Sequence, residues 1–71
     1  MVWNYRVIKM SDQDEEEWIG ICEVFYNDKD EPILYSSPVC VSGESLDDLD
    51  ITLYNMVESL GKPILTKENF K

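Results

Sequence analysis

Three stretches in the first half of the chain carry the residue pattern of β-strands. Residues 3–10 are aromatic and β-branched with partial alternation, which predicts a strand with one apolar face. Residues 18–26 are apolar at both alternating sets of positions, as is typical of a central strand covered on both sides. Turn-forming residues at 27–32 separate this run from a third strand that begins at Ile33. Pro38 interrupts that strand, so 39–41 continues it only after a bend or at an edge.

The second half of the chain carries the pattern of one amphipathic helix over residues 46–60. Ser45 is a good N-cap, and Asp48 three residues later gives a near match to the capping box. Gly61 fits the position after the helix, and Pro63 prevents continuation. Apolar residues at spacings of three and four predict one buried stripe. The residues of this stripe are Leu46, Leu49, Leu53, Met56, Val57 and Leu60.

This order of elements predicts a single α+β domain over residues 1–71. The expected architecture is a three-stranded antiparallel sheet with one C-terminal helix on one face, β-β-β-α. Residues 64–66 could add a short fourth strand. A single helix covers only one face of such a sheet, while the first two strands carry large apolar residues on both. The pattern therefore predicts a homodimer that covers the second face.

The charge of the chain excludes one class of partner and favours another. Fifteen acidic and six basic residues give a net charge of −9, which repels nucleic-acid backbones and anionic membranes. An acidic domain suits a basic protein partner and also keeps a small protein soluble. No apolar run approaches the ~20 residues that span a bilayer, and no secretory signal pattern is visible, so a cytoplasmic location is expected.

The residue types needed for most active sites are missing from the chain. There is no histidine, so neither a Ser-His nor a Cys-His pair can form. The two cysteines, Cys22 and Cys40, are too few for a zinc site. Both lie in apolar runs, where a buried reduced state is favoured over a disulfide bridge, although a bridge stays open.

Acidic residues are the remaining candidates for a catalytic or metal-binding role. Glu23 lies within an apolar strand. It is either a tuned acid or metal ligand, or a structural residue that faces solvent or pairs with Arg6 or Lys9 across strands. The acidic runs at 12–15 and 28–31 lack the central glycine and distal glutamate of a calcium-binding loop. The sequence therefore predicts no catalytic residue, no metal and no cofactor.

Several residues are candidates for partner binding. Ile51 and Tyr54 lie outside the apolar stripe of the helix, either as scattered surface residues or as a binding patch. Acidic residues in the first helical turns are candidates for contact with a basic partner. The full candidate set is Trp3, Tyr5, Ile51, Tyr54, Asp47, Asp48 and Asp50.

Two resemblances to known proteins add to this picture. The run Ser-Gly-Glu-Ser-Leu-Asp-Asp-Leu at 42–49 resembles the strand-to-helix junction of HicB-like antitoxin domains. That resemblance implies a partial RNase H-like fold, β-β-β-α-β, and a small basic RNA-cleaving toxin as partner. The opening Trp-Asn-Tyr-Arg-Val at 3–7 is similar to short bacterial and phage proteins of unknown function, a likeness that implies no activity.

Three hypotheses for function follow from these observations. The first is a non-enzymatic protein-binding or regulatory domain, homodimeric, that acts on a basic protein. The alternative is an acidic inhibitor that mimics nucleic acid with Asp47, Asp48, Asp50 and the loop at 12–17. The third is a metal-dependent enzyme that uses Glu23.

Overall fold

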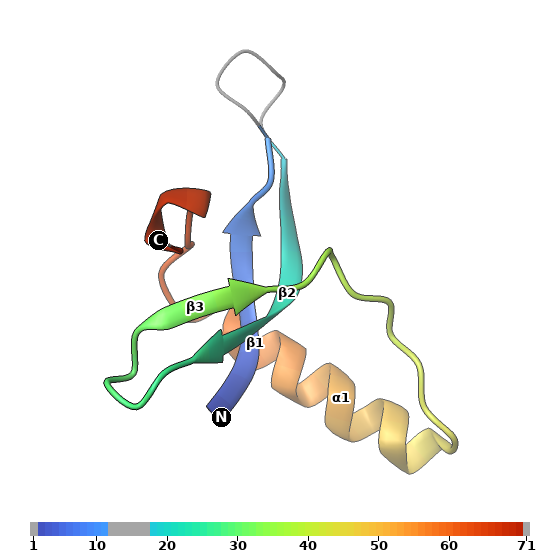
Figure 1. Ribbon diagram of the computed structural model, residues 1–71. Coiled ribbons are helices and arrows are strands. Elements are labelled where there is room, and N and C mark those ends of the chain that lie inside the picture. The colour runs from blue at the N-terminus through green and yellow to red at the C-terminus, as the bar shows by residue number, and fades with distance from the viewer. Residues whose placement is uncertain (1, 12–17, 71) are drawn as a thin grey trace.

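The computed structural model describes residues 2–11 and 18–70 and has the predicted order of elements (Figure 1). Three strands are followed by one helix and a single 3₁₀ turn. These elements are β1 (Val2–Lys9), β2 (Ile19–Tyr26), β3 (Pro32–Tyr35), α1 (Leu46–Ser59) and η1 (Lys67–Asn69). The α+β class and the β-β-β-α order are confirmed. The acidic loop at 12–17 lies outside the described residues.

The sheet is antiparallel with strand order β1-β2-β3. β1 and β2 pair along their whole length, from Val2 opposite Tyr26 to Lys9 opposite Ile19. The outer edge of β1 carries one parallel bridge to Leu65, whose backbone N–H donates to Val7 O at 2.9 Å. The fourth strand considered at 64–66 is therefore reduced to this bridge.

One face of the sheet carries the main core, and the C-terminal segment covers it. Ile8, Cys22 and Val24 are fully buried there. The partly buried side chains packed on them are Met10, Tyr26, Tyr35, Leu65 and Phe70. The ring centroids of Tyr35 and Phe70 are 4.7 Å apart. The C-terminal segment thus covers a face of the sheet that we expected a second chain to cover.

Arg6 attaches this C-terminal segment to the sheet. Its Nη2 donates to Pro63 O at 2.8 Å, and its Nη1 donates to the hydroxyl of Tyr26 at 3.2 Å. Arg6 lies opposite Cys22, whereas Glu23 lies opposite Tyr5 and so points to the other face. The predicted pairing of Arg6 with Glu23 is therefore wrong, because alternation along the strands separates the two side chains.

Helix α1 packs on the opposite face, mainly against β1. Met56 and Ser59 are buried there, and Val7 is the buried strand residue on that face. The hydroxyl of Ser59 donates to Met56 O, so this small polar side chain is satisfied within the helix. The N-terminal half of α1 extends past the sheet (Figure 1).

The predicted buried stripe of the helix is wrong in most of its positions. The exposed fractions are 83% for Leu46, 47% for Leu53, 61% for Val57 and 64% for Leu60. The helix is rotated about its axis so that small side chains, together with Met56, face β1. One edge of the apolar stripe meets the sheet, and the remainder faces outward.

The start of α1 is built as its capping residues predict. Ser45 Oγ accepts a hydrogen bond from the backbone N–H of Asp48 at 3.1 Å. Gly43 allows a close approach, because a Cβ there would lie 2.8 Å from that of Asp48 and 3.1 Å from Leu49 N. Local contacts therefore hold the projecting half of the helix.

Replacing Ser45 with alanine should lower the free energy of unfolding by about 1 kcal/mol, because an N–H of the first turn loses its acceptor. Urea denaturation followed by circular dichroism measures this loss. Ser42→Ala is the matched control, since Ser42 is exposed in the same connecting segment. Equal losses for the two variants would contradict the cap.

Candidate functional site

An exposed aliphatic surface runs along the outer side of α1. Leu46, Leu53, Val57 and Leu60, here called the outer stripe, recur at helical spacing and face away from the sheet. A run of this kind differs from the scattered exposed apolar residues of an ordinary surface, because its members are contiguous. It is an exposed aliphatic surface on one side of α1.

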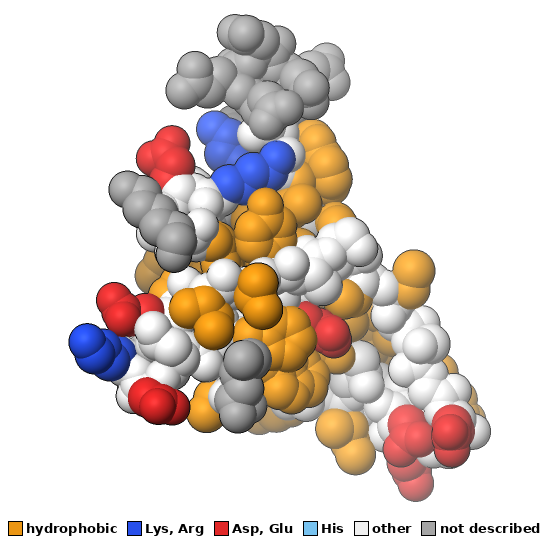
Figure 2. Space-filling view, in the orientation of Figure 1, with side chains coloured by type: hydrophobic (Ala, Val, Ile, Leu, Met, Phe, Trp, Pro, Cys, Tyr) orange, Lys and Arg blue, Asp and Glu red, His pale blue; other side chains and the backbone are white. Residues whose placement is uncertain are grey.

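Acidic residues surround the N-terminal half of this surface. Figure 2 shows red side chains gathered at the helix start, at the lower right. Asp47 and Asp48 lie in the first turn, and no basic residue lies in the last turn of α1. By helical periodicity, Asp50 borders the outer stripe, whereas Asp48 lies on the other side of the helix. The acidic end therefore flanks two different surfaces.

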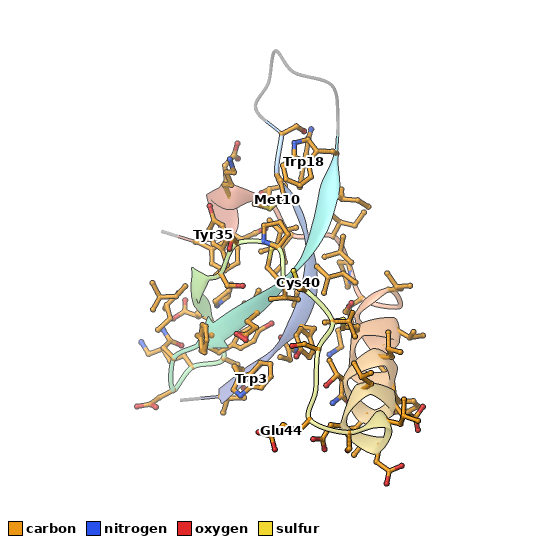
Figure 3. All side chains as sticks on the ribbon, turned by 90° about the vertical axis from the view of Figure 1, so that its right-hand side faces the viewer. Trp3, Met10, Trp18, Tyr35, Cys40 and Glu44 are labelled. Atoms are coloured by element: carbon orange, nitrogen blue, oxygen red, sulfur yellow. The ribbon has the colours of Figure 1, made fainter. Side chains whose placement is uncertain are left out.

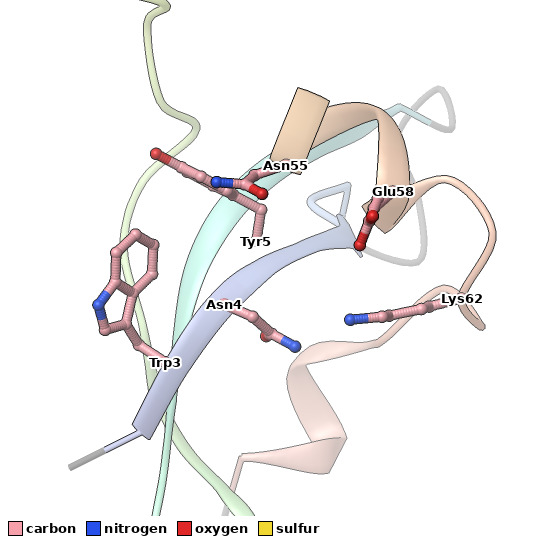
Figure 4. Close-up of a pocket in the computed structure, with 6 residues that line it drawn as sticks. All are labelled: Trp3, Asn4, Tyr5, Asn55, Glu58 and Lys62. Atoms are coloured by element: carbon pink, nitrogen blue, oxygen red, sulfur yellow. The ribbon is translucent and has the colours of Figure 1, made fainter. Parts of the chain in front are cut away.

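A cleft of about 350 Å³ lies on the opposite side of the helix, between α1 and β1 (Figure 4). Its lining consists of Trp3, Asn4, Tyr5, Asn55, Glu58 and Lys62. The rings of Trp3 and Tyr5 meet edge to face, with centroids 5.2 Å apart. Figure 4 shows the side chains of Asn4 and Lys62 pointing toward each other.

The structure thus divides the predicted binding residues between two surfaces. Trp3 and Tyr5 line the cleft, while Asp50 and Tyr54 adjoin the outer stripe. The sequence missed Asn55, Glu58 and Lys62, because polar residues on a helix are expected on any surface. Their spacing could have identified this surface in the sequence, because helical periodicity places Ile51, Asn55 and Glu58 on one side of the helix.

Tyr54 interacts with Glu58, its neighbour one helical turn later. The carboxylate of Glu58 raises the pKa of Tyr54, first by hydrogen bonding to the phenol and second by repelling the phenolate charge. Tyr54 therefore presents a neutral hydroxyl beside an exposed aliphatic surface.

The two cysteines have different environments and are not bridged. Cys22 is buried with its Sγ 3.8 Å from Met10 Sδ, and burial raises the pKa of its thiol. Cys40 is exposed in the segment that joins β3 to α1 (Figure 3). Its predicted burial in a strand is wrong, because β3 ends at Tyr35 and the chain bends beyond it.

A thiol reagent applied to the native protein should therefore react rapidly with one cysteine per chain, and with both after unfolding. Burial and a raised pKa protect Cys22, since the thiolate is the reactive form. Absorbance of the released chromophore measures the count. Cys40→Ser should remove the rapid phase, and a rapid phase that persists in this variant would show that Cys22 is accessible.

Other chemistry has little support in the described part of the chain. Residues 2–11 and 18–70 hold no group of three or more Cys, Asp or Glu side chains placed to bind a metal ion. The backbone N–H of Glu23 donates to Ser36 Oγ at 3.0 Å, which holds the start of the connecting segment beside β2.

Within residues 2–11 and 18–70, no helix is both long and apolar enough to cross a bilayer.

No protein-family model, curated sequence or solved structure matches this chain.

Proposed function

We propose that the chain is a non-enzymatic protein-binding domain that acts as a homodimer on a basic protein partner. The outer stripe of α1 is the observation that carries the proposal. A helix that packs with one edge of its apolar stripe and presents the remainder to water lacks part of its contacts. A second protein surface supplies them.

The exposed area supports a second copy as the occupant of the outer stripe. The accessible surface of the chain is 5483 Å², whereas a compact monomer of 8.3 kDa exposes about 4,600 Å². The excess of about 900 Å² matches the roughly 800 Å² that each partner buries in an interface of standard size. A dimer across the outer stripe buries part of the exposed apolar surface of α1.

Charge favours an antiparallel pairing of the two helices. A two-fold axis near Leu53 places Leu46 opposite Leu60 of the second copy and leaves Leu53 facing its own equivalent. Parallel helices would bring the two acidic helix starts together, at a cost from like-charge repulsion. The antiparallel arrangement separates them and aligns the helix dipoles favourably.

The net charge supports the second part of the proposal. A charge of −9 attracts a basic partner from a distance and raises the rate of encounter. By helical periodicity Asp48 lies on the side of α1 away from the outer stripe, so it stays accessible in the dimer. A small basic RNA-cleaving toxin, which the HicB-like junction implies, is one partner of this chemistry.

Two measurements test the proposal. Sedimentation equilibrium over a wide concentration range should show a reversible monomer–dimer equilibrium, and a strict monomer would contradict the homodimer. A lysine-bearing probe peptide should bind with an affinity that falls as salt rises, because exposed charges are screened. Equal binding of a peptide with glutamine in place of lysine, insensitive to salt, would contradict the basic partner.

A further inference from the structure

The outer edge of β1 has unpaired backbone groups beside the cleft. Lys9 N donates to Leu65 O at 2.8 Å, and Val7 O accepts from Leu65 N at 2.9 Å, so both residues turn their backbone groups away from β2. Hydrogen bonding alternates along an antiparallel strand, so Trp3 and Tyr5 turn theirs to the same edge. Within the described residues, no backbone group pairs with Trp3 or Tyr5 on that side.

This edge lacks the sequence features that usually protect an exposed strand. Natural edge strands carry lysine, proline or a bulge that prevents pairing with another chain. The segment Val2 to Tyr5 has none of these, and its register with β2 is regular. The edge is therefore competent to pair with an incoming strand.

The cleft beside this edge forms a groove in which a ligand could bind. Asn55 and Glu58 form its helical wall, and Lys62 stands on the far side from Trp3 in Figure 4. A cavity of about 350 Å³ lies at the lower end of the size range for ligand sites. A strand edge beside a helix is the setting in which peptides bind by strand addition.

We propose that an extended segment of the basic partner binds here as an added strand on β1. The peptide takes four backbone hydrogen bonds from the N–H and C=O groups of Trp3 and Tyr5. The net charge of −9 attracts the basic segment to this edge, and Asn55 and Glu58 line the helical side of the cleft that its side chains enter.

This inference rests on the proposed function for the basic character of the partner, and it adds the site and the mode of binding. The site lies on the opposite side of α1 from the outer stripe. Dimerisation and peptide binding are therefore compatible in one assembly.

The test uses a short probe peptide of alternating valine and lysine with two N-methylated versions. One version carries methyl groups on the amides of odd positions, and the other on the amides of even positions. An added strand directs alternate amides at β1, so one version should bind about tenfold more weakly or worse, and the other should bind like the parent. Equal affinities for both versions and the parent, or no binding by the parent, would overturn strand addition.

Hydrogen exchange locates the bound peptide on the full chain. The amides of Trp3 and Tyr5 should exchange more slowly with the parent peptide bound. Protection confined to the outer stripe of α1 would overturn the site.

Matched variants test the groove itself. Asn55→Trp fills the cleft and should weaken the parent peptide about tenfold or more, without changing the monomer–dimer equilibrium. Ser42→Trp is the control, because Ser42 is exposed in the segment before α1 and does not line the cleft. Unchanged affinity in Asn55→Trp would overturn the groove.

The two proposals fail separately. If a glutamine version of the peptide binds as tightly and still depends on the odd or even position of N-methylation, strand addition stands and the basic partner fails. If the lysine peptide binds with strong salt dependence but without any effect of N-methylation, the basic partner stands and strand addition is overturned.

Discussion

Replacing Ile8 with alanine is expected to remove about 2–5 kcal/mol from the free energy of unfolding. Ile8 is fully buried in the cluster with Cys22 and Val24. The change removes buried methyl groups and leaves a cavity where strand and C-terminal segment meet. A domain of this length has a total stability of about 4–11 kcal/mol, so the variant should approach or cross the unfolding threshold.

Urea denaturation monitored by tryptophan fluorescence measures this loss. Ile64→Ala serves as the control, because Ile64 lies in the same C-terminal segment but is 55% exposed. The control should change stability by no more than about 0.5 kcal/mol. Equal losses in the two variants would show that the C-terminal segment does not cover the sheet as described.

Replacing Val57 with glutamate should weaken the dimer about 100-fold or more, which corresponds to about 2.7 kcal/mol. The substitution places a charge in the apolar seam that the proposed dimer buries, near the acids of the other copy's helix start. The monomer should remain folded, because Val57 is 61% exposed and makes few contacts within its own chain. Sedimentation equilibrium measures the change, and circular dichroism checks the helix.

Ile51→Glu is the matched control for this experiment. Ile51 is 60% exposed, β-branched and on the same helix, but it lies away from the outer stripe. Its substitution adds the same charge and should leave the dimer intact. If both variants dissociate alike, general charge repulsion rather than the outer stripe controls association.

Local patterns in the sequence were sufficient to predict the elements and their order. Alternation of apolar residues predicted β1 and β2 and placed Trp3 and Tyr5 on one face. Ser45 and its neighbours predicted the start of α1, because a cap forms between residues three positions apart. These features depend on contacts within a few residues, so the sequence alone determines them.

The candidate sites were only partly visible in the sequence. Trp3 and Tyr5 were identified because aromatic residues on an apolar strand are conspicuous. Asn55, Glu58 and Lys62 were missed, because their role arises only when α1 lies beside the β1 edge. The unpaired edge was also invisible, since it depends on which part of β1 the Leu65 bridge leaves free.

Tertiary packing alone decided how α1 meets the sheet. Helical periodicity predicts that an apolar stripe exists, but it does not specify which edge of the stripe meets a strand. Ser59 and Met56 face β1, and Leu46, Leu53, Val57 and Leu60 are left outside. The C-terminal segment covers the other face through long-range contacts of Arg6 and Leu65. The sequence therefore determined the elements, and packing between distant segments determined which surfaces stay exposed.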